Sequence, residues 1–463
     1  MSHLNRRDTL KCLAFAAIPG VGTPLRYAAE KTPAPGKTAE QWPAVDVLVC
    51  GGGPAGIAAA MMAARAGAKT LLVERYGRLG GMAVQAMVGP LMGSVRSGWV
   101  DGILEHIGGR RVDYEFIDLK YAELLETAGC QVLLHAWMAE PLLDGQRVIG
   151  VRLLTKQGMI AVRARVTVDA TGDGDVACGA GAEFDRGRGA GPNWAADGLL
   201  QPMTIMFRVS GVDHAESMEA KRGRKAFRFP DGRTWNEVTK EANARGELPP
   251  TVGMVRTYLS QRDDQRVINA TQVNGVDGTT VRDLTQAELE GRRQVQPILE
   301  FLRKHAPGFQ NAYVSGMPAV IGVRETRRIR GVESLAVEDL LAGKQSPRAV
   351  VREASFPIDI HNPAGIGQAQ GVSAAHPLGK DPEVKPYDIP YGCLVPQRVN
   401  GLLVAGRCIS GTHEALASYR VQVIAMATGI AAGVAAAQAA RQNIEPREAD
   451  VARIQGVVFE ARS

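Results

Sequence analysis

The sequence predicts an α/β fold in which a Rossmann-type dinucleotide-binding domain carries an inserted α+β domain that binds the substrate as a cap. A short apolar strand runs directly into a glycine-rich turn, a small-residue helix and a second strand that ends on an acid. Two more strand-and-turn units lie far downstream, at 166–172 and 400–407. The length of 463 residues exceeds one ordinary domain and suits two.

The composition is that of a globular protein, with 45% hydrophobic and 22% charged residues. We expect no apolar run long enough to span a bilayer, and therefore no stable membrane insertion. The formal net charge is +6, but the basic residues are scattered and rarely stand beside aromatic ones, so no nucleic-acid partner is expected. The run Lys221–Lys225 is an exception, which we interpret as a solvated loop or as a contact for an anionic substrate.

Residues 1–30 are similar to a twin-arginine export signal. Arg6 and Arg7 precede Leu10 and Lys11, and the short apolar stretch 12–18 follows. The resemblance implies an exported protein, periplasmic or extracellular, and the alternative is a basic cytoplasmic N-terminus. Residues 31–43 are predicted to be a proline-rich linker.

The first predicted strand, 45–50, leads into the glycine-rich turn, and the predicted helix 57–66 follows. In such a turn Gly51 permits the tight bend, Gly53 lets the backbone approach a pyrophosphate, and Gly56 lets the helix pack closely on the strand. The helix N-terminus then offers free N–H groups and a favourable dipole to the phosphates. The turn residues expected to bind the dinucleotide are Gly51, Gly53, Pro54, Ala55 and Gly56.

The second predicted strand, 69–73, ends on Glu74, which stands 18 residues after Gly56. A carboxylate there can accept hydrogen bonds from both hydroxyls of an adenosine ribose, and it repels a 2′-phosphate, which disfavours NADP. The alternative, that the glycines merely connect a strand to a helix, does not explain why strand, turn, helix and acid fall in register.

Four motifs extend the pattern: 79–83 (LGGMA), 169–175 (DATGDGD), 323–329 (VRETRRI) and 403–410 (LVAGRCIS). Together with Ile389-Pro390-Tyr391 they resemble the glutathione-reductase superfamily, specifically the FAD-dependent oxidoreductase family with a single dinucleotide fold. The family commonly has a basic residue after the Ile-Pro-Tyr triplet, where this chain has Gly392 and Cys393. The resemblance implies FAD, with its adenine near Glu74 and its isoalloxazine near the C-terminal motif. The further FAD-binding residues that it implies are Arg75, Gly80, Gly81, Met82, Ala170, Thr171, Gly172, Gly406, Arg407 and Ser418.

The resulting domain plan is discontinuous. The FAD-binding domain comprises 44–190 and 396–445, the substrate-binding domain is 191–395, and 446–463 is a tail. The first part is predicted to hold a helix at 119–128, a strand at 131–135 and an antiparallel pair, 146–154 with 159–164. The cap is predicted to hold a strand at 203–209 and a helix at 284–305, and the last helix is predicted at 419–438. Because the cap lacks a second glycine fingerprint, electrons are expected to come directly from the substrate.

A base is needed to take the proton that accompanies hydride transfer. His413, beside Glu414, is the first candidate, because the resemblance implies a place near the isoalloxazine. The alternative is a histidine that hydrogen-bonds FAD or caps the turn. The second candidate is the Asp359-Ile360-His361 segment, for which a plain turn is the alternative.

Arg324 lies in a segment crowded with charges, and it is interpreted either as an anchor for a carboxylate or hydroxyl or as part of a structural ion-pair network. Tyr391 and Arg420 are substrate or flavin contacts by family position. No metal is expected, because Asp173 and Asp175 have turn chemistry and no histidine clusters with them. Cys408 is expected to be a small buried residue.

The resemblance implies an FAD-dependent oxidoreductase, acting as a dehydrogenase or oxidase. Hydride would pass from a small polar substrate, such as an alcohol or a sugar, to flavin N5, and on to an acceptor that the sequence does not identify. The alternatives are a reductase of an activated double bond, similar to fumarate reductase, with Arg324 or Arg420 as proton donor or carboxylate clamp, and an RNA-associated flavoprotein. The oligomeric state stays open.

Overall fold

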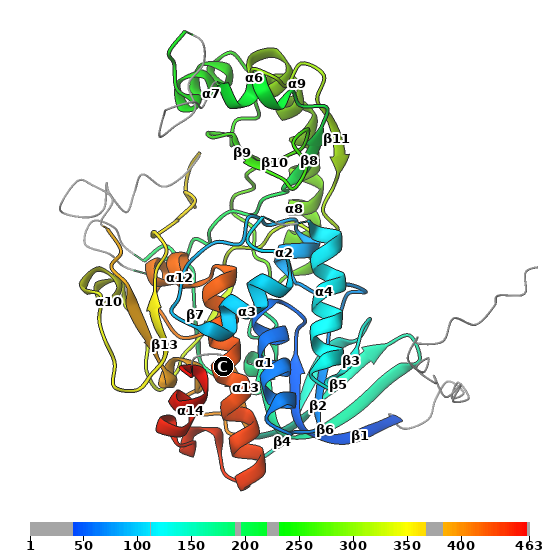
Figure 1. Ribbon diagram of the computed structural model, residues 1–463, viewed down its shortest axis with the longest axis vertical. Helices are drawn as coiled ribbons and strands as arrows, with labels where there is room; N and C mark the ends of the chain where they lie inside the picture. The colour runs from blue at the N-terminus through cyan, green and yellow to red at the C-terminus, as the bar shows by residue number, and fades with distance from the viewer. Residues whose placement is uncertain (1–39, 112, 190–195, 220–230, 367–382, 461–463) are drawn as a thin grey trace, which may run out of the picture. The chain divides into compact units, whose positions relative to one another are not determined.

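The computed structural model describes residues 40–111, 113–189, 196–219, 231–366 and 383–460. The predicted export signal and the basic run 221–225 lie outside these residues. The main sheet has the strand order β3-β2-β1-β6-β5-β4 (Figure 1). Its strands are β1 (Glu40–Cys50), β2 (Thr70–Val73), β3 (Gln131–Leu133), β4 (Trp137–Asp144), β5 (Arg147–Thr155), β6 (Gly158–Asp169) and β15 (Leu402–Val404).

The long strand β6 joins the two parts of this sheet. Along one edge it pairs in parallel with β1. Along the other edge its first half pairs antiparallel with β5, and its second half pairs in parallel with β15. The sequence prediction of separate strands at 159–164 and 166–169 is therefore wrong, since β6 runs through both and is buried at its parallel end.

Strand β1 begins earlier than predicted. Glu40 to Trp42 pair with residues 160–162 of β6, so the end of the predicted linker 31–43 belongs to the sheet. The register shifts between Trp42 and Val45, which places Pro43 at an irregularity where its missing N–H is tolerated. The hydrogen-bonding edge of β6 explains why this stretch is a strand.

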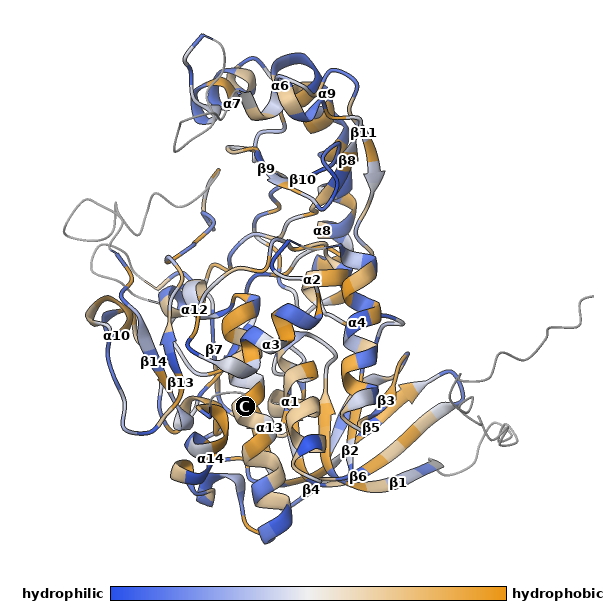
Figure 2. Cartoon of the chain, in the orientation of Figure 1, coloured by the Kyte–Doolittle hydropathy of each residue, from blue (hydrophilic) through white to orange (hydrophobic). Residues whose placement is uncertain are grey.

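Two helices meet at glycines behind the sheet, α1 (Pro54–Arg65) and α13 (Gln422–Gln442). A Cβ at Gly429 would stand 2.0 Å from the Ala55 carbonyl oxygen, so the backbones touch without side chains between them. α13 is long and apolar enough to span a bilayer, contrary to the sequence expectation, and its apolar stretch is wholly buried (Figure 2). It is thus a core helix, close-packed through small residues.

The other α-helices on this part of the chain range from 4 residues in α2 to 14 residues in α4. They are α2 (Met82–Gln85), α3 (Gly98–His106), α4 (Tyr114–Thr127), α5 (Asp175–Gly179), α10 (Val337–Ala342), α12 (His413–Tyr419) and α14 (Val451–Val458), with 3-10 turns η1 (Tyr391–Leu394), η2 (Gly406–Cys408) and η3 (Pro446–Glu448). This part of the chain also has two small antiparallel sheets. One pairs β7 (Phe184–Arg186) with β12 (Arg327–Ile329), and the other pairs β13 (Ala349–Ala354) with β14 (Tyr387–Pro390). The predicted tail 446–463 contains η3 and α14, whose Ile454 and Val458 are buried.

The cap has its own sheet and core, drawn mostly in green in Figure 1. Its antiparallel order is β11-β8-β10-β9. The elements are β8 (Phe207–Ser210), β9 (Arg256–Leu259), β10 (Arg266–Asn269), β11 (Tyr313–Gly316), α6 (His214–Glu219), α7 (Trp235–Ala244), α8 (Val281–Arg293) and α9 (Val295–His305). The predicted helix 284–305 is divided at Gln294 into α8 and α9. At this break the Gln294 side chain accepts a hydrogen bond from the Gln272 N–H and donates one to the Gln272 carbonyl oxygen.

Candidate active site

A cavity of about 440 Å³ is lined by residues of the glycine-rich turn, the start of α13 and the cap sheet. Most of the predicted FAD-binding residues face it: Gly51, Gly53, Pro54, Ala55, Glu74, Arg75, Gly81, Met82, Ala170, Thr171, Gly172 and Arg407. Four others, Gly56, Gly80, Gly406 and Ser418, are not among the residues that line it. Their roles lie in packing or in hydrogen bonds behind the wall.

The backbone of the turn explains its glycines. Gly51 has a φ of +107°, and a Cβ there would stand 2.4 Å from the Ala170 carbonyl oxygen. A Cβ on Gly56 would stand 1.8 Å from the Gly51 carbonyl oxygen, so the first turn of α1 lies against the end of β1. A Cβ on Gly81 would stand 2.7 Å from the Gly53 Cα. The two glycine loops therefore meet, and side chains would fill the space between them.

The N-terminus of α1 faces the cavity with Pro54 in its first turn and no side-chain cap on its N–H groups. Such an end suits the phosphates of a dinucleotide. Glu74 lies nearby and accepts hydrogen bonds from the backbone N–H of Gly52, at 2.6 Å, and of Tyr76, at 2.9 Å. Burial raises the pKa of Glu74, partly offset by these N–H groups. Each carboxylate oxygen can accept one further bond, as a ribose requires.

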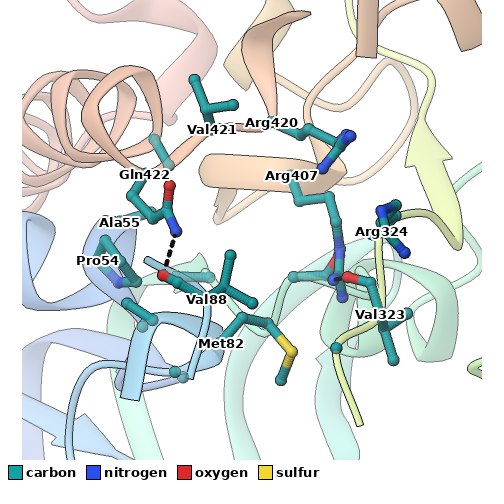
Figure 3. Close-up of a pocket in the computed structure, with 18 of the residues that line it drawn as sticks. Pro54, Ala55, Met82, Val88, Val323, Arg324, Arg407, Arg420, Val421 and Gln422 are labelled. Atoms are coloured by element: carbon teal, nitrogen blue, oxygen red, sulfur yellow. Dashed lines mark hydrogen bonds between the residues drawn. The ribbon is translucent and has the colours of Figure 1, made fainter. Parts of the chain in front are cut away.

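The N-terminus of α13 lines the same cavity (Figure 3). The predicted helix 419–438 is in fact broken between α12 and α13, with Val421 as the N-cap of α13. Gln422 donates a hydrogen bond to the Val88 carbonyl oxygen at 2.9 Å, which ties this helix to the loop after α2. The positive end of a helix dipole stabilises negative charge, as on the reduced flavin ring.

Arg407 joins three segments of the wall. Its guanidinium donates to Asp173 at 2.6 Å, to the Gly172 carbonyl oxygen at 2.8 Å, and to the Val323 carbonyl oxygen. Thr326 also donates to Asp173, at 2.9 Å. Asp173 therefore ties these segments together, and Asp175, the third acid of the motif, pairs with Arg327 at 3.2 Å.

The polar end of the cavity is built from side chains of distant segments. Arg324 donates to the Pro202 carbonyl oxygen and to Thr204, both at 2.7 Å. Arg420 donates to the backbone carbonyl of Asp359 at 2.9 Å and to its carboxylate at 3.3 Å. His361 Nε2 lies 3.7 Å from the same carboxylate. Figure 3 shows Arg324, Arg407 and Arg420 on the side of the cavity opposite Pro54 and Ala55.

These side chains strongly affect one another's protonation. Burial, and after it the positive charge of Arg324, lower the pKa of His361 to about 3, so its imidazole is neutral at pH 7. Burial would raise the pKa of Asp359, but hydrogen bonding to His361 and the charges of Arg420 and Arg324 hold it well below its ordinary value. Burial and the adjacent Arg420 lower the pKa of Arg324 to about 9. The cluster therefore presents a carboxylate, a neutral imidazole and two guanidinium groups.

The first predicted base, His413, lies elsewhere. Its side chain is buried, and Nδ1 stands 2.9 Å from the Glu325 carboxylate, which also pairs with Arg328. Neither His413 nor Glu414 is among the cavity-lining residues. The structure therefore places His413 against the Glu325 carboxylate and not in the wall of the cavity.

Several other candidates serve the framework. Ser418 donates to the Phe356 carbonyl oxygen at 2.6 Å, and the Tyr391 hydroxyl donates to the Pro446 carbonyl oxygen at 2.7 Å. Cys408 is buried, and burial raises the pKa of its thiol. Arg256, on β9, lines the cavity but was missed, because a four-residue cap strand carries no motif.

Comparison with known proteins supports this geometry. The chain from 46 to 458 matches the family model described as FAD dependent oxidoreductase. Over 147 residues it is 32% identical to digeranylgeranylglycerophospholipid reductase 1 of Methanopyrus kandleri, a match that covers 27% of this chain. The chain spans only 39% of the length of that curated relative.

Two solved structures align with most of the chain at low identity. A geranylgeranyl bacteriochlorophyll reductase-like protein of Thermoplasma acidophilum is 14% identical, with 91% of this chain and 84% of that chain covered and a TM-score of 0.46. A myxobacterial chondrochloren halogenase is 15% identical, with 90% and 78% covered and a TM-score of 0.43. The family match over nearly the whole chain, together with a glycine cradle that fits a dinucleotide, shows that the chain belongs to the FAD-dependent oxidoreductase family and that FAD is its cofactor.

Proposed function

We propose that the protein is a dehydrogenase or oxidase that removes hydride from a hydroxyl-bearing carbon of a small polar substrate, of which alcohols and sugars are the broad class. The observation that carries this proposal is the polar cluster of Asp359, His361, Arg324 and Arg420 in the cavity that also contains the dinucleotide turn. Hydride donors, a base and fixed charges must meet in one site for such a reaction.

FAD, when bound, supplies the acceptor for the hydride and so takes both electrons of the C–H bond. His361 takes the hydroxyl proton in our proposal, because its imidazole is neutral and one ring nitrogen faces the Asp359 carboxylate. An N–H directed at Asp359 leaves the lone pair on the other ring nitrogen for the substrate. The C–H and O–H bonds break, a carbonyl forms, and Asp359 stabilises the imidazolium.

The two arginines orient the substrate. Arg324 is fixed by Pro202 and Thr204 of the cap, and Arg420 by Asp359, so both guanidinium planes are held before a substrate enters. Preorganised charges of this kind lower the cost of reaching the reactive geometry. Apolar walls, among them Met206 and Phe356, line the same cavity and reduce the access of water.

The test is an anaerobic titration of the purified flavoprotein with alcohols, sugars and hydroxy acids, followed by visible absorption. Bleaching of the oxidised flavin bands by one class, with the carbonyl product recovered, is the expected result. If no hydroxyl compound bleaches the flavin, while a chemically reduced flavin is reoxidised by unsaturated compounds, the proposed direction is wrong.

A second candidate is the reduction of an activated double bond. It is favoured by the pKa of Arg324, which burial and Arg420 lower to about 9, since an arginine in that state can act as a proton donor. The curated relative is named as a reductase. Anaerobic turnover of unsaturated acids with a reduced dye separates this reaction from the first.

We also propose that the protein is exported through its N-terminal segment, on the basis of Arg6 and Arg7. The pathway carries proteins that have already folded around a cofactor, which suits a flavoprotein. Changing both residues to lysine should retain the protein in the cytoplasm, and the single change Lys31→Ala, in the predicted linker, is the control. Fractionation of cells that express the full chain measures the outcome.

A further inference from the structure

The polar end of the cavity has more positive than negative charge. Four guanidinium groups line it, those of Arg256, Arg324, Arg407 and Arg420; Arg407 is paired with Asp173 and Arg420 with Asp359. Within the described ranges, no carboxylate lies at ion-pair distance from Arg256 or Arg324. Charges that are removed from water without a partner are costly, so this end of the cavity suits an anion.

The hydrogen bonds of these arginines also indicate an anion site. Arg420 has a buried Nε without an acceptor, although its Nη2 is bonded to Asp359. Arg324 bonds the described part of the protein through Nη1. Buried N–H donors are nearly always satisfied, and a bound molecule can supply the missing acceptor. Two guanidinium groups with spare donors in one cavity match the two oxygens of a carboxylate.

We infer that the substrate is a small hydroxy acid, whose carboxylate is held by Arg420 and Arg324 while His361 takes the proton of its hydroxyl. The inference rests on the proposed function and narrows its substrate class from alcohols and sugars in general to those that carry a carboxylate. Arg256, on the cap strand β9, adds long-range attraction for the anion.

Binding of the carboxylate also prepares the base. Burial lowers the pKa of His361 most, the charges of Arg324 and Arg420 lower it further, and Asp359 raises it. A carboxylate that neutralises the two arginines therefore raises the affinity of His361 for a proton when the substrate is in place. A neutral alcohol in the same position leaves the imidazole a poor base. The two arginines, acting on His361, thus favour acids over alcohols in the rate of proton transfer as well as in binding affinity.

Matched pairs of compounds test the inference. Glycolate, lactate, glycerate and glucuronate are compared with ethylene glycol, 1,2-propanediol, glycerol and glucose, in which a neutral group replaces the carboxylate. The holoenzyme is titrated anaerobically, and flavin bleaching and the flavin difference spectrum are recorded. We expect at least one acid to bleach the flavin with an apparent Kd at least tenfold below that of its neutral partner. Equal responses within every pair would overturn the inference.

Variants assign the effect to the arginines. Arg420→Gln should weaken binding of the effective acid by about tenfold to a hundredfold more than it weakens binding of the neutral partner, and Arg420→Lys should be intermediate because it keeps the charge and loses the bidentate geometry. The matched control is Arg262→Gln, an exposed position in the turn after β9, which should bind the acid as the unmodified protein does. If Arg420→Gln and Arg420→Lys lose FAD while acid binding follows FAD content alone, the arginines serve the cofactor and the inference fails.

The two proposals can fail separately. Propionate and pyruvate have the carboxylate but no hydroxyl to oxidise. If they compete and perturb the flavin spectrum while no hydroxy acid bleaches it, the carboxylate site stands and hydroxyl oxidation is wrong. If polyols bleach the flavin and no carboxylate binds better than its neutral partner, hydroxyl oxidation stands and the carboxylate site is wrong.

Discussion

The two ends of the cavity are built in different ways. The dinucleotide end is built mostly from backbone, where the turn from Gly51 to Gly56 meets Ala170 after β6 and the loop at Gly81. The polar end consists of side chains from three segments: Arg324 bonds Pro202 and Thr204, Arg420 bonds Asp359, and His361 lies beside the Asp359 carboxylate. The dinucleotide end depends on glycines, because a Cβ at these positions would clash with neighbouring backbone, and the polar end depends on where charged side chains are placed. Substitutions at the two ends should therefore fail differently, one in cofactor binding and the other in rate.

The largest effect is expected at the glycine turn. Gly56→Ala places a Cβ 1.8 Å from the Gly51 carbonyl oxygen, so α1 must move away from the sheet. We expect loss of FAD and destabilisation of roughly 3 kcal/mol or more. The matched control is Gly456→Ala in α14, where nothing lies within 4 Å, and where alanine should stabilise the helix by up to about 1 kcal/mol. Flavin content and thermal unfolding measure both, and full FAD content in Gly56→Ala would contradict the close-packing argument.

A change at the polar end should leave FAD in place. His361→Gln removes the proposed base, and the rate constant for flavin reduction by substrate should fall by about 10²- to 10⁴-fold in stopped-flow experiments. The comparison is His413→Gln, which removes the buried contact with Glu325. This variant should lower the free energy of unfolding by about 1–3 kcal/mol and leave the rate constant for flavin reduction nearly unchanged. The reverse pattern would restore His413 as the base.

The ion pair between Arg407 and Asp173 lies between the two ends of the cavity, and its removal should have an intermediate effect on the free energy of unfolding. Asp173→Asn removes the charge that Arg407 pairs with at 2.6 Å, in a place where only 12% and 8% of the two side chains are exposed. The uncompensated guanidinium should cost about 3 kcal/mol of unfolding free energy. Asp185→Asn, which breaks the half-exposed pair with Arg330, should cost less than about 1 kcal/mol. Equal losses in urea unfolding would show that Arg407 finds another partner.

The same contrast decides what the sequence could predict. Gly51, Gly53 and Glu74 could be placed because their tasks depend on spacing within a single strand–turn–helix unit. His361 and Arg420 could only be named as candidates, since their proximity depends on how the chain returns to the cavity through the cap and α13. His413 stands next to the flavin motif in the sequence, yet its side chain is buried against the Glu325 carboxylate, which also pairs with Arg328.

The smallest effect concerns stability against pH, and it tests whether His361 is neutral. Its pKa in the folded protein is about 3, against about 6.5 in an unfolded chain. Between these values the unfolded state binds the extra proton, so the contribution of His361 is fully present above pH 6.5 and is lost as the pH falls. From pH 6.5 to pH 5 the loss should be about 2 kcal/mol, at ~1.4 kcal/mol per pH unit. In His361→Gln that part of the pH dependence should disappear from urea-unfolding free energies. Identical pH dependence in both proteins would mean that the pKa of His361 is the same in the folded and the unfolded chain, so that burial and Arg324 do not depress it.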